Sequence, residues 1–292
     1  MEKRFELSKQ KDTLKSGFKQ RGVFFPASVF DPLSARMAEQ LGFELGMLAG
    51  SVASWHVLGA PDHVVLTLSE LAETAHRICR ASEISLLVDA DHGFGNALNV
   101  RRTVQELEDA GVSGLTIEDT ELPQTFSKPA KGLIDPLEAR GKFQAALQAR
   151  NDPTLCVFAR TTALTALPLE QALERIELYA TLKVDGLFLV GVQKWEQLKA
   201  VRAITSLPLL LGSTPKEMKD PKALSSLNVK VALQGHSPYT AAIQATYEEL
   251  KRLRESTSTL KAPEIEREKL LSTLTKDADY ENWIKTYLHS PK

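Results

Sequence analysis

Short, continuous apolar runs alternate with amphipathic helical patterns along most of the chain, and this alternation is the strongest constraint on its fold. A continuous apolar run is typical of a strand that is buried on both faces, as in a parallel sheet covered by helices. Eight such units in 292 residues favour a closed (β/α)8 TIM barrel over an open sheet. The expected strands span residues 23–30, 45–50, 86–91, 114–118, 155–160, 185–190, 208–212 and 230–234.

The helical patterns lie between these runs and beyond both ends of the barrel. They predict helices at residues 32–41, 69–82, 98–110, 137–149, 169–182, 194–204, 241–255 and 263–288, and a charged N-terminal helix at 3–20. The N-terminal helix has Phe5, Leu14 and Phe18 as apolar anchors and is expected to cover one end of the barrel. We predict one domain over residues 1–292, with the barrel at about 20–250 and a C-terminal helical extension at about 251–292.

The last predicted helix carries an apolar face. Tyr280, Trp283, Ile284 and Tyr287 are spaced as i, i+3, i+4 and i+7, which places them on one side of a helix. This face could pack on the barrel of its own chain or on a second subunit, and the sequence favours neither arrangement. In both cases it is no cofactor site.

Charge and composition exclude several classes of protein. The formal net charge is -1 and basic residues are not clustered, so no surface for nucleic acid or for an anionic membrane is expected. No apolar window is long enough to span a membrane, and the charged N-terminus does not resemble a signal peptide. Cys79 and Cys156 lack metal-ligand or disulfide spacing, and we expect both to be buried packing residues in a reducing cytoplasm.

The apolar run from residue 86 ends in two carboxylates and a glycine-rich turn. Because side chains alternate along a strand, the carboxylates of Asp89 and Asp91 are expected to point to the same face. Two neighbouring carboxylates repel each other unless a cation offsets the repulsion, and oxygen ligands suit Mg²⁺ or Mn²⁺. The alternative is that Asp91 only caps the helix that starts near Asn96.

Polar residues stand at the ends of five expected strands. In a TIM barrel the active site lies at the C-terminal ends of the strands, so these side chains are expected to converge. Each residue could instead have a purely structural role, such as a helix cap, a surface charge, an ion-pair partner or a packing histidine. Their common position favours one functional site over six separate structural roles. The six residues are Ser51, Asp89, Asp91, Glu118, Arg160 and His236.

A metal held by carboxylates and faced by an arginine suits a 2-oxo acid. Such a substrate could chelate the ion through its carboxylate and keto oxygens, while the Lewis acid stabilises the developing enolate. A guanidinium such as that of Arg160 can pair with a carboxylate. Because a β-keto acid contains its own electron sink, this chemistry needs no organic cofactor, and the chain contains neither a dinucleotide fingerprint nor a P-loop.

Three motifs carry a resemblance to a known family. The segments DADHGFGNALNV (89–100), GLTIED (114–119) and ART (159–161) resemble the isocitrate lyase and phosphoenolpyruvate mutase superfamily. The segments SVFDP (28–32), GSVAS (50–54) and GH (235–236) are most similar to its metal-dependent oxaloacetate decarboxylase branch.

The resemblance implies a role for each candidate residue. It implies Asp89 as the direct Mg²⁺ ligand, Asp91 and Glu118 as ligands through water, and Ser51, Arg160 and His236 as substrate contacts. It also implies a homotetramer that exchanges terminal helices. We expect Arg160 to stabilise the developing charge and His236 to orient the departing carboxylate or to relay a proton.

The loop after the fourth strand separates this chain from part of the superfamily. The lyases of the superfamily carry a cysteine and a histidine there, and residues 121–134 contain neither, which argues against isocitrate or methylisocitrate cleavage. Lys128 and Lys131 of this loop could close over an anionic substrate or remain solvated. The leading hypothesis is Mg²⁺-dependent decarboxylation of oxaloacetate or a related 2-oxo diacid. The alternatives are substituted malate lysis, phosphonopyruvate chemistry, or binding of a 2-oxo acid without catalysis.

Overall fold

The computed structural model describes residues 14–19, 22–123, 132–255 and 271–287. The chain divides into two compact units, one ending at Ser237 and the other starting at Pro238. The prediction that the whole chain forms one domain stays a prediction. Lys128 and Lys131 lie outside the described residues.

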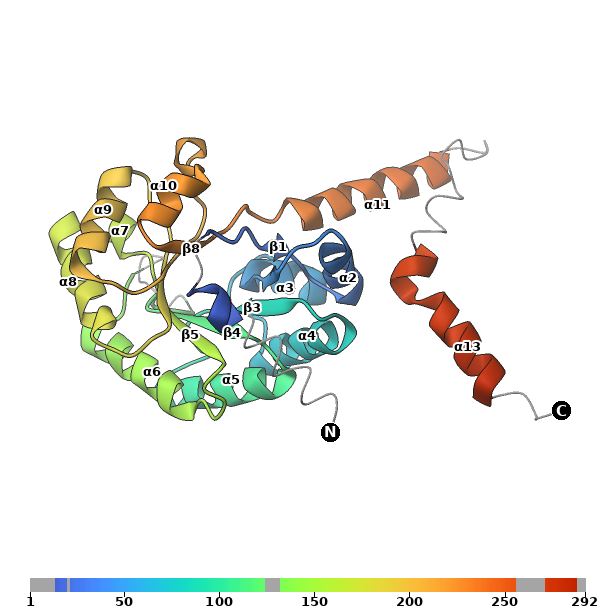
Figure 1. Ribbon diagram of the computed structural model, residues 1–292, viewed down its shortest axis with the longest axis horizontal. Helices are drawn as coiled ribbons and strands as arrows, with labels where there is room; N and C mark the ends of the chain where they lie inside the picture. Colours follow the sequence, from blue (N-terminus) through green and yellow to red (C-terminus); the bar gives the residue numbers. More distant parts are fainter. Residues whose placement is uncertain (1–13, 20–21, 124–131, 256–270, 288–292) are drawn as a thin grey trace. The chain divides into compact units, whose positions relative to one another are not determined.

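The first unit is built on eight parallel strands that follow one another around the sheet in chain order (Figure 1). Phe24 closes the ring, because its amide donates to the Lys230 carbonyl at 2.7 Å and its carbonyl accepts from the Ala232 amide at 2.9 Å. The predicted (β/α)8 barrel is therefore confirmed. The strands are β1 (Ala27–Ser28), β2 (Leu45–Leu48), β3 (Ser85–Asp89), β4 (Gly114–Glu118), β5 (Cys156–Thr161), β6 (Gly186–Leu189), β7 (Leu209–Leu211) and β8 (Val229–Ala232).

Helices surround the strands, as Figure 1 shows. The predicted helices appear as α2 (Pro32–Gln40), α4 (Leu68–Ala81), α5 (Ala97–Ala110), α6 (Pro136–Ala149), α8 (Leu169–Ala180) and α9 (Trp195–Ile204). The sequence did not predict α3 (Gly50–Leu58), α7 (Ala163–Ala166), the 3-10 turn η1 (Lys216–Met218) or α10 (Pro221–Ser226). Side-chain caps fix several starts. In α4, for example, Thr67 accepts from the Glu70 amide and Glu70 accepts from the Thr67 amide.

Alternate residues along each strand face two different cores. One face packs under the helices, where Val88, Ile117 and Ala159 are fully buried. The other face fills the barrel interior with Leu87, Phe158 and their neighbours. Cys79 and Cys156 are both buried, as predicted.

The N-terminal segment covers one end of the barrel interior. Leu14 and Phe18 are buried against the inward-facing side chains, and the Phe18 ring lies edge-on to Phe158 with centroids 5.6 Å apart. This agrees with the anchoring predicted for Leu14 and Phe18, whereas Phe5 lies outside the described residues.

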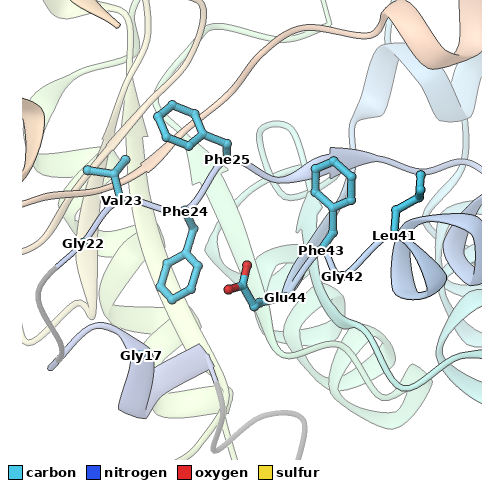
Figure 2. Close-up of a pocket in the computed structure, with 9 residues that line it drawn as sticks. All are labelled: Gly17, Gly22, Val23, Phe24, Phe25, Leu41, Gly42, Phe43 and Glu44. Atoms are coloured by element: carbon cyan, nitrogen blue, oxygen red, sulfur yellow. The ribbon is translucent and has the colours of Figure 1, made fainter. Parts of the chain in front are cut away.

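A pocket of about 440 Å³ lies at the same end, where the chain enters β1 and β2 (Figure 2). Its lining combines glycines and apolar residues with Glu44, the charged side chain drawn among Phe24, Phe25 and Phe43 in Figure 2. These residues precede their strands, so the pocket is at the end of the barrel opposite to the strand ends that carry the candidate residues.

The second unit contains α13 (Asp277–Tyr287) and all but the first residue of α11 (Ser237–Glu255). Tyr280, Trp283 and Tyr287 of α13 are all exposed. None of the helices among the described residues combines the length and apolar character that a membrane span requires.

Candidate active site

Asp89 is the last residue of β3, and its carboxylate accepts from three neighbours. Oδ1 accepts from the Thr116 hydroxyl at 3.1 Å and from the Asp91 amide at 3.3 Å. Oδ2 pairs with Nη1 of Arg160. Thr116 stands beside Asp89 because β3 and β4 pair in that register. The side chain of Asp89 is therefore both buried and fixed.

Asp91 reaches the same place by a different route from the one predicted. The strand ends at Asp89, and Asp91 lies in the following turn with φ of 45°. Strand alternation therefore does not align the two carboxylates, and that part of the prediction is wrong. The left-handed turn instead brings the Asp91 carboxylate against Gly50, where a Cβ would lie 2.7 Å from Oδ1.

Asp91 does not cap the helix that follows, because another residue forms the N-cap. The Asn96 side chain accepts from the Leu98 amide at 2.9 Å and forms the N-cap of α5. Gly93 has φ of 79°, and a Cβ there would lie 2.4 Å from Val100. The glycine-rich turn thus packs tightly on α5. The Asp91 carboxylate is not used as a cap and lies at the C-terminal end of the barrel.

Glu118 and Arg160 are neighbours across the β4–β5 ladder. Arg160 Nε lies 3.1 Å from Glu118 Oε2, and the guanidinium also lies over the Phe188 ring at 5.6 Å. The Nε proton is buried without a well-aligned hydrogen bond. One guanidinium thus holds two carboxylates from two adjacent strands and is itself held in place by an aromatic ring.

The cluster carries more negative than positive charge, because three buried carboxylates face one guanidinium. Burial and the charges of Asp89 and Glu118 raise the pKa of the Asp91 carboxyl well above its ordinary value. Burial also raises the pKa of Glu118 against the opposing effect of Arg160. Burial alone would lower the pKa of Arg160, but Asp89 and Glu118 outweigh it and raise that pKa.

This excess of buried oxygen ligands fits a hard divalent cation. Mg²⁺ keeps several waters and is commonly bound by one or two carboxylates, so a direct ligand at Asp89 with Asp91 and Glu118 further out is chemically reasonable. Within the described ranges, no three His, Cys, Asp or Glu side chains are grouped to ligate one ion directly. The division between direct and water-mediated ligands stays a prediction.

Ser51 lies in the first turn of α3 and not at the end of a strand. Ala49, the N-cap residue, gives this helix no side-chain cap. The backbone N–H groups of the first turn therefore remain for another acceptor, and a helix N-terminus favours anions. Ser51 stands beside Gly50, which contacts Asp91, so the structure brings Ser51 to the carboxylate cluster.

His236 follows β8 and is half-buried. Its Nδ1 lies 3.2 Å from the Ser28 hydroxyl at the end of β1, and the Trp55 ring of α3 lies edge-on at 6.4 Å. Burial lowers the pKa of His236, and the negative charge of Asp89 partly offsets this effect. The structure therefore brings all six predicted residues to the C-terminal end of the barrel.

The sequence does not predict a second buried hydrogen-bond network, which lies around Asp119. Asp119 Oδ2 accepts from Thr161 at 2.9 Å, from Arg175 at 3.0 Å and from Tyr179 at 2.8 Å. Arg175 also donates to the Ile134 carbonyl at 3.0 Å. Asp119 and Thr161 directly follow Glu118 and Arg160, so this network fixes the two strand ends. An adjacent acidic pair at a strand end was the available signal.

Asp62 is another acidic side chain that the sequence did not single out. Partial burial and the charge of Asp89 raise the pKa of its carboxyl, and Arg160 opposes this effect. The Ser54 hydroxyl donates to the carbonyls of Ala60 and Pro61, each at 3.2 Å, and so holds the loop that carries Asp62. No local pattern marks Asp62, because it lies in a loop.

The geometry agrees with the comparison to known proteins. The family model described as phosphoenolpyruvate phosphomutase matches residues 14–254. The chain belongs to the phosphoenolpyruvate phosphomutase family. Among relatives in this family, an oxaloacetate decarboxylase of Bradyrhizobium sp. (strain ORS 278) is 48% identical over 263 residues, which cover 90% of this chain and 91% of the relative. The oxaloacetate decarboxylase of Rhodopseudomonas palustris (strain BisB18) is 50% identical over 253 residues, 87% of this chain and 88% of the relative.

Solved structures of the family share the fold. A phosphoenolpyruvate phosphomutase from Streptomyces platensis subsp. rosaceus is 26% identical with a TM-score of 0.84, and the match covers 96% of this chain and 99% of that one. A phosphonopyruvate hydrolase in complex with oxalate and Mg²⁺ is 28% identical with a TM-score of 0.81 and the same coverage. The predicted superfamily is thereby confirmed.

Proposed function

We propose that this protein is a lyase that decarboxylates oxaloacetate, or a closely related 2-oxo diacid, to pyruvate and CO₂ with the help of Mg²⁺. Two findings support the proposal. The chain is about half identical to two oxaloacetate decarboxylases over nearly its whole length. The observation that carries the mechanism is the cluster in which Arg160 holds Asp89 and Glu118 at the strand ends, with Asp91 beside them.

The metal is assigned to the carboxylate cluster. Asp89 would hold the ion directly, and Asp91 and Glu118 would hold it through water. A bound Mg²⁺ supplies a Lewis acid for the carboxylate and keto oxygens of the substrate. Mn²⁺ has the same ligand preference and can replace it. No organic cofactor is needed, because the keto group next to the breaking bond accepts the electron pair.

The side chains around the substrate have separate tasks. When the C3–C4 bond breaks, its electron pair moves toward the keto oxygen, and CO₂ leaves. Arg160 stabilises the negative charge that develops there, since carboxylates hold Nη1 and Nε and leave Nη2 for the substrate. Ser51 and the first turn of α3 bind a substrate carboxylate. His236 contacts the carboxylate that departs, and a proton taken from solvent at C3 converts the enolate to pyruvate.

The direct test is pyruvate release from oxaloacetate by the purified protein with Mg²⁺ and with EDTA. Free divalent ions decarboxylate this substrate without a protein, so Arg160→Ala at the same Mg²⁺ concentration is the control. We expect metal-dependent release at least about 100-fold above that variant, the usual cost of losing one group that stabilises transition-state charge. Release equal to that of the variant contradicts the proposal.

Other activities of the family are the main rivals. A panel that includes phosphonopyruvate and substituted malates separates them from decarboxylation. A barrel that only binds 2-oxo acids would bind oxalate in calorimetry and turn over no member of the panel.

The assembly we propose is a homotetramer with exchanged terminal helices. Tyr280, Trp283 and Tyr287 are 59%, 46% and 74% exposed and follow one face of α13, and such an aromatic stripe is typical of an interface. The side chain of Ile284 lies outside the described residues. We expect light scattering to give the mass of a tetramer, and Trp283→Glu to shift it toward smaller species. The burial of Cys79 and Cys156 agrees with a cytoplasmic location.

A further inference from the structure

Ser28 and His236 meet although 208 positions separate them in the sequence. Ser28 ends β1 and pairs in register with Met47, whose side chain lies in the barrel interior. The Ser28 side chain therefore points inward at the strand ends, and the residue is only 6% exposed. His236 comes from the loop after β8, the strand next to β1 in the closed barrel.

The Ser28 hydroxyl has one polar partner among the described residues, the Nδ1 atom of His236 at 3.2 Å. A hydroxyl carries one proton and two lone pairs, whereas a neutral imidazole has one N–H and one bare nitrogen. If the hydroxyl donates to Nδ1, its proton is satisfied. If Nδ1 donates instead, the hydroxyl proton is left buried without an acceptor, which costs about 1–3 kcal/mol.

This asymmetry selects one form of the ring. We propose that Ser28 is a positioning residue that donates to Nδ1 of His236 and so holds the imidazole as the Nε2–H tautomer, with Nε2–H directed to the substrate carboxylate that departs. The inference rests on the proposed function for the identity of that carboxylate. The assignment of the tautomer itself does not depend on any catalytic activity.

Two further observations support this orientation. The Trp55 ring meets the imidazole edge-on, with an interplanar angle of 80°, and restricts its rotation. Nε2 is on the far side of the ring from Ser28, and in the described part of the chain it has no protein hydrogen bond.

The tautomer decides between the two roles expected for His236. A neutral ring that carries its proton on Nε2 can donate a hydrogen bond to a carboxylate. It has no lone pair there to accept a proton, and giving up its own proton would leave an unfavourable imidazolate anion. His236 is therefore a substrate-orienting donor. Its loss should raise KM more than it lowers kcat, since the hydrogen bond is already made to the bound substrate.

The first experiment is ¹⁵N NMR of histidine-labelled protein without substrate, with His236→Gln to assign the signal. We expect Nε2 protonated and Nδ1 bare in the wild type, and a mixture of the two tautomers in Ser28→Ala. A wild-type signal with Nδ1 protonated overturns the proposal, as does a Ser28→Ala signal identical to the wild type. This measurement stands whether or not the protein decarboxylates oxaloacetate.

The second experiment is kinetic and uses matched serine variants. We expect Ser28→Ala to raise KM for oxaloacetate about tenfold with kcat changed less than about threefold, which corresponds to about 1.4 kcal/mol. Ser28→Thr keeps a hydroxyl and should recover most of the loss. Ser226→Ala removes an exposed hydroxyl that donates to the Ala223 carbonyl in α10, and it should behave as the wild type. A fall in kcat at constant KM contradicts the assigned role.

Discussion

Two successive layers of the barrel interior have opposite chemistry. In the lower layer Leu87 and Phe158 pack with Leu14 and Phe18 of the N-terminal segment. Two residues further along the same strands, the upper layer places Asp89 and Arg160 side by side. The lower layer gains free energy by burying apolar surface, while the upper layer loses free energy by burying charge. The lower layer stabilises the fold, and the upper layer is available for chemistry.

The largest effect that separates the layers is expected at Phe158. Phe158→Ala leaves a cavity under the charged layer and should lower the free energy of unfolding by about 3–5 kcal/mol, because the ring is fully buried. Urea unfolding measures the loss. The turnover of the protein that remains folded should stay within about threefold of the wild type. A stable variant with lost turnover would mean that the two layers are not separable.

Asp91→Asn tests how much free energy of unfolding the protein loses by burying charge in the upper layer. The folded chain binds protons at Asp91 more tightly than the unfolded chain does, because its pKa is raised by burial and by Asp89. Ionisation therefore destabilises the metal-free protein as the pH rises from about 4, the unfolded carboxyl value, toward the raised folded value. Asparagine tolerates the left-handed backbone at this position.

In EDTA at pH 7 we expect Asp91→Asn to be more stable than the wild type, by about 1.4 kcal/mol for each unit by which the folded pKa exceeds the unfolded one. The gain should shrink toward zero near pH 4, where both states of the wild type hold the proton. Thermal unfolding across this pH range checks the sign. A gain that grows as the pH falls would show that Asp91 is stabilised as the anion.

A pair of glycine variants gives the smallest predicted effect. In Gly50→Ala the new Cβ would lie 2.7 Å from Asp91 Oδ1, so the carboxylate must move, and we expect kcat/KM to fall about tenfold, or about 1.4 kcal/mol. Gly141→Ala in α6 is the control, since apart from the helix's own backbone a Cβ there would meet no atom of the described residues within 4 Å. It should stabilise the protein by about 0.5–1 kcal/mol without changing turnover. Equal kinetics in both variants would contradict the close contact at Asp91.

The sequence predicts the barrel well because strand burial and helix amphipathicity are local signals. It misses α3, since Gly50–Leu58 contains no acidic residue and no Lys or Arg to mark a solvent face. It overextends β1, where only Ala27–Ser28 forms ladder structure beyond the bridge at Phe24. The helix-period pattern also fails for α7 and α10, which have 4 and 6 residues.

The candidate site likewise has parts that local sequence signals predict and parts that they do not. Positions at strand ends are predictable, and Asp89, Glu118 and Arg160 lie where the strand count puts them. The turn that directs Asp91 and the contact between Ser28 and His236 depend on tertiary geometry, with 208 positions between the latter two residues. Asp119 was missed because its partners, Arg175 and Tyr179, come from α8.

The most direct test of the account is the turnover of Asp89→Asn, measured as Mg²⁺-dependent pyruvate release per folded protein. The substitution removes one of three buried carboxylates and leaves Glu118 to pair with Arg160, so the fold should remain. We predict a loss of at least about 1000-fold, or about 4 kcal/mol of transition-state stabilisation, with little change in Tm. Turnover within tenfold of the wild type would remove Asp89 from the active site and contradict the assignment of the upper layer.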